Sequence, residues 1–158
     1  MNFFSSMDAA SSAMTAERFS MDVISQNIAN ANTENTAAGT PYRRQSAVIE
    51  SAGENSGRPF ALPACLDDDG GSREPAVQGV KVEGVVQDNS NFRYVYDPTN
   101  PNAIRSGKRK GYVAMPNVNL ITEMTDMIAA SRAYEANATV VDTAKAIATK
   151  GMDIGTNH

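Results

Sequence analysis

Apolar residues at both ends of this chain recur with the spacing of a packed helix. In residues 3–33 they fall at alternating steps of four and three, and only Glu17 interrupts the series. A helix turns such positions onto one narrow face that packs against a partner helix. Neither Gly nor Pro occurs before Gly39, so nothing in this segment breaks the helix early. The positions are Phe3, Met7, Ala10, Met14, Met21, Ile24, Ile28 and Ala31.

The C-terminal segment, residues 117–150, has the same spacing and also lacks Gly and Pro. Because a narrow apolar stripe needs a partner, we predict that the two terminal helices pair as a coiled coil. Asn117 or Asn119 is suited to cap the second helix, and Gly151 and Gly155 are suited to end it. Ser131 and Lys145 interrupt a stripe made of Leu120, Met124, Met127, Tyr134, Ala138, Val141, Ala148 and Met152.

Between the two helices lie all seven prolines and nine of the eleven glycines, which favours turns and short strands. The fold class we predict is therefore α+β, with a small β-rich middle domain inserted between the paired terminal helices. The expected divisions are 1–35 for the first helix, 36–116 for the middle domain with an irregular loop at 51–76, and 117–158 for the second helix.

Strand patterns in the middle domain begin after Pro41 and return at 77–87. The alternation of valines slips by one residue near Gly84, which predicts a β-bulge there. A further strand at 92–96 follows the turn-forming residues 88–91, so we expect these two strands to form a hairpin. Phe92, Tyr94 and Tyr96 fall on one face, either as the core of the middle domain or as a patch between subunits.

Composition and charge exclude several classes of function. The net charge of −4 gives no electrostatic reason to expect nucleic acid, and the short basic cluster at 108–110 is interpreted as a solvated loop. No segment has the roughly 18 consecutive apolar residues that span a bilayer, so no direct membrane insertion is expected. The N-terminus also lacks the basic region of a Sec signal peptide.

Catalytic chemistry finds little support in the residues present. Cys65 stands close to the acidic run 67–69, which disfavours its thiolate, and the only histidine is His158. The acidic run lacks the ligand spacing of a calcium loop. We therefore predict no catalytic, cofactor-binding or metal-binding residues and no enzyme activity.

The chain resembles the bacterial flagellar rod and hook proteins in several motifs. These are NIANANT at 27–33 followed by GTPYRRQ at 39–45, then VYDPTNPNA at 95–103, GYVAMPNVN at 111–119, and the helical run at 124–137. The resemblance extends over residues 1–49 and 77–155. It does not extend to 51–76, which is longer than the family leads us to expect.

The resemblance implies an axial structural protein whose terminal helices pair in a tubular assembly. More narrowly, the resemblance implies that the chain is a proximal-rod subunit of the flagellar basal body, located in the periplasm. Its implied partners are further copies of itself, other proximal-rod subunits, the basal adaptor FliE, the distal rod and the flagellar type III export apparatus. The alternatives are another rod or hook component, or a coiled-coil adaptor outside the flagellum.

The apolar faces of the two predicted helices, together with the tubular assembly that the resemblance implies, indicate which residues form the interface between subunits. Asn27 and Asn30 either mark the end of the first helix or hydrogen-bond the backbone of an adjacent subunit, and both can hold. We also predict that both termini are largely disordered in a free monomer and fold on assembly. The expected interface comprises Met7, Met14, Met21, Ile24, Asn27, Ile28 and Asn30 on the first helix, and Leu120, Met124, Met127, Tyr134, Ala138 and Val141 on the second.

Overall fold

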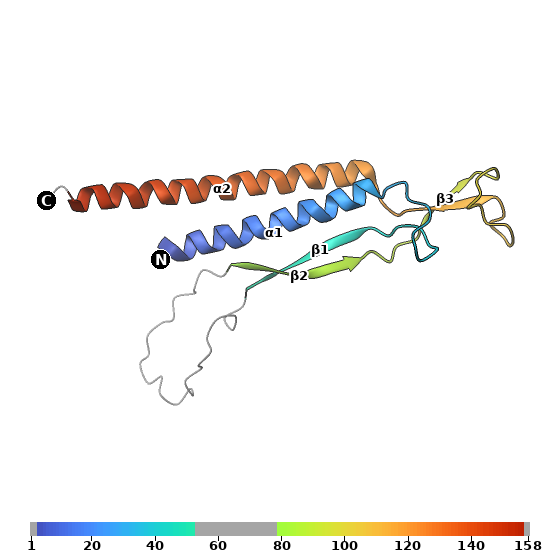
Figure 1. The fold of residues 1–158 in the computed structure, drawn as a ribbon, viewed down its shortest axis with the longest axis horizontal. Coiled ribbons are helices and arrows are strands. Elements are labelled where there is room, and N and C mark those ends of the chain that lie inside the picture. Colours follow the sequence, from blue (N-terminus) through green and yellow to red (C-terminus); the bar gives the residue numbers. More distant parts are fainter. Residues whose placement is uncertain (1–2, 53–78, 157–158) are drawn as a thin grey trace, which may run out of the picture.

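The computed structural model describes residues 3–52 and 79–156. Helix α1, Phe3–Ala29, and helix α2, Leu120–Thr156, run antiparallel and side by side, and α2 continues past the start of α1 (Figure 1). The predicted α+β fold with paired terminal helices is thus confirmed. The irregular loop, with Cys65 and the acidic run, lies outside the described residues.

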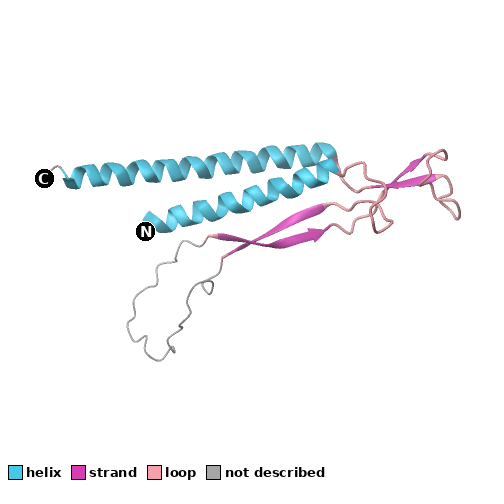
Figure 2. Cartoon of the chain, viewed as in Figure 1, coloured by secondary structure: helices cyan, strands magenta, loops and turns pink. Residues whose placement is uncertain are grey.

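Four strands form two separate antiparallel ribbons in the described middle region (Figure 2). Strand β1, Gln45–Ser51, pairs with β2, Val80–Gln87, and strand β3, Arg93–Tyr96, pairs with β4, Tyr112–Met115. Helix α1 contacts α2 and both strands of the first ribbon, so it lies between them.

The β1–β2 ribbon contains the predicted bulge. Val48 pairs with Gly84 and Ile49 with Val82, so Glu83 is the extra residue. The expected hairpin of 77–87 with 92–96 is wrong, because β2 pairs with β1 and β3 with β4. The segment between β2 and β3 is instead tied to other elements, since Arg43 donates to the carbonyls of Asp88 and Ser90 at 3.2 and 3.4 Å.

The aromatic residues in and just before β3 do not form a domain core. The guanidinium of Arg43 lies 4.3 Å from the centre of the Phe92 ring, and that of Arg109 lies 4.0 Å from the Tyr94 ring. Tyr96 is 64% exposed. A two-stranded ribbon has no second layer to cover its rings, so cations cover two of them and water reaches the third.

The packed core between the helices is built mainly from alanine. Its buried apolar side chains on the helices are Ala10, Ala16, Val23, Ala130 and Ala144. Small residues let the helices approach closely, but each buries little apolar area. The core of one chain is therefore thin.

Helix α2 is rotated slightly from the predicted orientation. Met127, Val141 and Ala148 lie in the seam as expected, but Glu123, Ala130 and Ala144 are buried in place of their neighbours Met124, Ser131 and Lys145. Glu123, the first of these buried residues, is held by hydrogen bonds from Asn27 and Arg44.

The prediction that Gly151 and Gly155 end the second helix is also wrong. The helix continues through Gly151 and Gly155 to Thr156. Gly151 does not take the positive φ of a helix-ending glycine. It is therefore accommodated within the helix.

Candidate functional site

A buried polar junction joins the end of α1 to β1 and to the start of α2. The Asn27 amide is fully buried at its centre. Its Nδ2 donates to the Gln45 carbonyl at 2.7 Å and to Glu123 Oε2 at 2.9 Å. Its Oδ1 accepts from the Gln45 amide at 2.9 Å and from the Tyr42 hydroxyl at 3.0 Å. An amide has two donor hydrogens and two acceptor lone pairs, so Asn27 is saturated.

The charge in this junction belongs to Glu123, which is also fully buried. Arg44 Nε donates to Glu123 Oε1 at 2.5 Å, and Arg44 Nη2 lies 3.3 Å from Asp126 Oδ2. The hydrogen bond to Glu123 is the main cause that raises the pKa of Arg44. Burial, and then the negative charge of Glu123, raise the pKa of Tyr42.

Two asparagines before α2 complete the junction. Asn119 Oδ1 accepts from the Ile121 amide at 3.1 Å, which makes Asn119 the cap of the helix. Asn117 has a different role, because its Oδ1 accepts from the Arg44 amide at 2.8 Å while its Nδ2 donates to the Asp88 carbonyl at 3.1 Å. The entry to α2 is thereby fixed to the β-region.

The predicted interface residues of α1 are covered within the chain to different degrees. Asn27 hydrogen-bonds a backbone as expected, but the backbone is that of Gln45 in the same chain, and no bonding capacity is left for a neighbour. Asn30 Nδ2 donates to the Gln26 carbonyl at 2.9 Å, as befits a helix end. The predicted apolar residues of α1 are half-buried: Met7, Met14, Met21, Ile24 and Ile28.

The predicted interface residues of α2 divide into two groups. Met127, Ala138 and Val141 are half-buried against the rest of the chain. Leu120, Met124 and Tyr134 are exposed. The structure thus places the first group in the seam of the protomer and the second group on its surface.

Exposed apolar side chains are concentrated on α2. Ile121 is 77% exposed and Ile128 is 62% exposed, one heptad further along, while Val140 and Ile147 repeat that spacing. The sequence prediction missed these four residues, although their seven-residue spacing was available as a signal. Along α1, by contrast, the exposed residues are mainly polar: Ser6, Asp8, Ser11, Thr15, Arg18, Asp22, Ser25 and Gln26.

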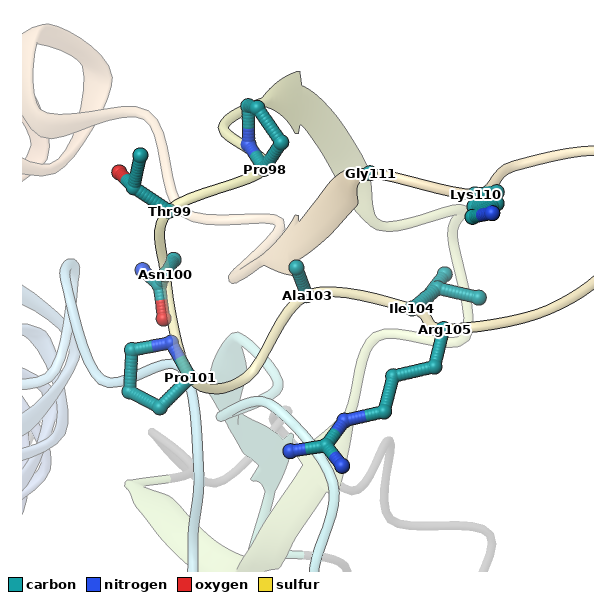
Figure 3. A pocket seen from close by; sticks show the side chains of 9 residues that line it. All are labelled: Pro98, Thr99, Asn100, Pro101, Ala103, Ile104, Arg105, Lys110 and Gly111. Carbon is teal, nitrogen blue, oxygen red and sulfur yellow. The ribbon is translucent and has the colours of Figure 1, made fainter.

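A hollow of about 410 Å³ lies within the loop between β3 and β4 (Figure 3). Arg105 and Lys110 are the titratable side chains that line it, and no carboxylate does. Among the described residues, no group of three His, Cys, Asp or Glu side chains is placed to hold a metal ion. None of the described helices is long and apolar enough to cross a membrane.

Comparison with known proteins places the helices in one family. Residues 7–35 match the family model for "Flagella basal body rod protein", and 109–154 match that for "Flagellar basal body rod FlgEFG protein C-terminal". The flagellar basal-body rod protein FlgC of Borreliella burgdorferi is 47% identical over 93% of both chains. This chain belongs to the flagellar basal-body rod protein family. FlgC proteins of Bacillus subtilis and Escherichia coli O6:H1 are 36% and 34% identical, over 98% and 94% of this chain and 99% and 94% of their own.

The segments that match the rod family models are the segments that carry the helix pair. The first match spans most of α1 with Asn27, and the second spans β4 and nearly all of α2. The expected rod family and its structural role are confirmed, and family membership removes the adaptor outside the flagellum as an alternative. Asn27 and Glu123 of the polar junction, and the exposed face of α2, therefore lie within the matched segments, whereas Tyr42, Arg44 and Gln45 lie between the two matches.

Proposed function

We propose that this chain is a subunit of the proximal rod that polymerises through α1 and α2 to form a torque-transmitting shaft. One observation carries the proposal: α2 exposes eight large apolar side chains, while the buried apolar core of the described residues has six members, four of them alanine. Burying one Ile stabilises by roughly 1.5–3 kcal/mol. Contacts with neighbouring helices would therefore add apolar burial that the chain does not supply alone.

Head-to-tail contacts between such subunits would generate a helical filament, because they do not close on themselves. The proposed partners are further copies of this chain, other rod proteins, the basal adaptor FliE and the distal rod. The proposed location is the rod within the periplasm, reached through the flagellar type III export apparatus. A thin core supports that route, since such a chain is readily kept unfolded for passage through a narrow channel.

The test replaces Ile121 or Ile147 with Asp in cells that lack the native copy. Both side chains are largely exposed, so each variant should fold, but a carboxylate placed in an apolar contact is strongly unfavourable. We expect at least a tenfold loss of the chain from purified basal bodies, with a parallel loss of swimming. The matched control is Asn89→Asp, which adds a carboxylate at an exposed position between β2 and β3.

Wild-type recovery of the Ile121→Asp and Ile147→Asp variants in basal bodies would refute polymerisation through the exposed face of α2. Far-UV circular dichroism of each purified variant, measured beside the wild type under conditions that give the wild type a folded baseline, shows whether a loss reflects assembly or folding.

A further inference from the structure

Positive charge is concentrated on the β3–β4 ribbon and its loop, residues 93–115, here called the basic ribbon. It carries five basic residues and one acidic residue, for a formal charge of +4, while the remainder of the chain carries nine basic and 17 acidic residues, for −8. A separation of this size within one chain creates a field that attracts an acidic surface. The cluster at 108–110 is part of this larger feature.

The loop that presents these charges has a defined shape. The Ile104 amide donates to the Tyr112 carbonyl at 2.9 Å, and the Gly111 amide donates to the Ile104 carbonyl at 2.9 Å. Gly111 has a φ of 82°, and a Cβ there would lie 2.9 Å from the Tyr96 ring. Arg105 and Lys110 both line the hollow within this loop (Figure 3).

The basic ribbon also has the composition of an interface. Tyr96, Val95 and Tyr112 are 64%, 40% and 37% exposed, and only Val113 is buried among the residues of its two strands. Two strands alone are marginally stable, so this ribbon gains from being covered. Tyr and Arg are the residue types that contribute most strongly to binding surfaces.

The exposed side of α1 is the complementary surface. The helix carries three acidic residues, Asp8, Glu17 and Asp22, and one basic residue, Arg18, for a formal charge of −2. Asp8, Arg18 and Asp22 are exposed, and Glu17 is half-buried. Its exposed stripe is polar, so it suits a charged partner better than an apolar helix. The ribbon lies at the far end of the molecule from the start of α1, so contact with Asp8 requires a second chain (Figure 1).

We infer that the basic ribbon of one copy docks on the exposed polar side of α1 in a neighbouring copy, with Asp8 and Asp22 as its ionic partners. This contact is electrostatic and separate from the apolar packing of α2, and it rests on the proposed function only in requiring that copies assemble. Because the two surfaces differ, the contact is heterologous and repeats along a filament.

The test crosslinks the concentrated full chain with a carbodiimide, which joins a lysine amine to a carboxylate without a spacer. Mixing isotope-labelled and unlabelled chains identifies links between copies by mass spectrometry. We expect mixed-isotope links from Lys108 or Lys110 to Asp8 or Asp22. Their yield should fall at least fivefold between about 0.1 M and 1 M salt, where the Debye length shrinks from about 10 Å to about 3 Å.

Charge reversal supplies the matched variants. Arg105→Glu with Arg109→Glu lowers the formal charge of the basic ribbon from +4 to 0 and should reduce the links at least tenfold. Lys145→Glu with Lys150→Glu makes the same charge change on α2 and should leave the links intact.

Links confined to a single isotope, or an undiminished yield after reversal, would overturn the inference. So would ribbon-dependent sedimentation with phosphatidylglycerol vesicles in place of links between chains, since it would make the partner a membrane. Oligomers that require Ile121 but not Arg105 and Arg109 would leave the proposed function standing and remove this inference alone. Oligomers that require neither would remove both.

Discussion

Arg44→Met is the substitution that should reveal how far the fold depends on its polar junction. Arg44 is the counter-ion of Glu123, whose side chain is fully buried. Without Arg44, that carboxylate keeps the Asn27 amide at 2.9 Å as its remaining hydrogen-bond donor in the junction. Removing one partner of a buried ion pair costs about 3–5 kcal/mol, because the other charge stays buried without compensation.

The ion pair between Arg44 and Asp126, at the exposed edge of the junction, should contribute far less to the free energy of unfolding. The Asp126 side chain is 44% exposed, and its contact with Arg44 is 3.3 Å long. Solvent-exposed ion pairs contribute about 0–1 kcal/mol, so Asp126→Asn should cost less than about 1 kcal/mol. Small domains unfold at a cost of about 5–15 kcal/mol, and a core made largely of alanine places this chain at the low end. Arg44→Met should therefore remove most of its stability.

The assay is urea unfolding followed by far-UV circular dichroism, at a protein and osmolyte concentration that gives the wild type a folded baseline. We expect the double variant Arg44→Met, Glu123→Met to be at least about 2 kcal/mol more stable than Arg44→Met, because no buried charge remains. A cost below about 1 kcal/mol for Arg44→Met, or a double variant no better than the single one, would refute this reasoning.

Two further predictions concern pH and concentration. The raised pKa of Tyr42 stabilises the fold fully below the ordinary tyrosine value of 10.0, and this contribution is lost as pH rises through the folded pKa. Tyr42→Phe should therefore flatten the fall of the urea midpoint above about pH 10, and an unchanged slope would contradict it. At dilutions where sedimentation shows a monomer, circular dichroism should report less helix than fully formed α1 and α2 would give, because ordering the backbone costs about 1–2 kcal/mol per residue. Two fully formed helices in the monomer would count against folding on assembly.

The sequence predicted the two helices and their pairing because heptad spacing is a local signal that extends over many residues. The bulge near Gly84 was predictable for the same reason, since the phase slip is visible within one strand. Strand pairing was not predictable in this way. β2 and β3 are separated by a short turn-like segment, yet each pairs with a strand elsewhere, because Arg43 and Asn117 hold that segment from outside.

The hydrophobicity pattern of the sequence does not predict the polar junction. Apolar spacing favours Met124 over Glu123 as a seam residue, and no local pattern shows that Arg44 and Asn27 lie opposite Glu123 in the fold. Asn27 was identified as important, but its partner was expected in another subunit. The exposed isoleucines of α2 were missed because one stripe was taken as the only apolar face.

The junction also explains how a seam of small residues selects one register. The buried alanines of the two helices, Ala10, Ala16, Ala130 and Ala144, give little preference between neighbouring alignments, because each alignment offers similar small contacts. The bonds from Asn27 to Glu123 and to Gln45 form in one alignment only, and any slip leaves a buried carboxylate and a buried amide without partners. A rod subunit whose larger apolar residues on α2 are mostly exposed thus sets the register of its helices with polar residues.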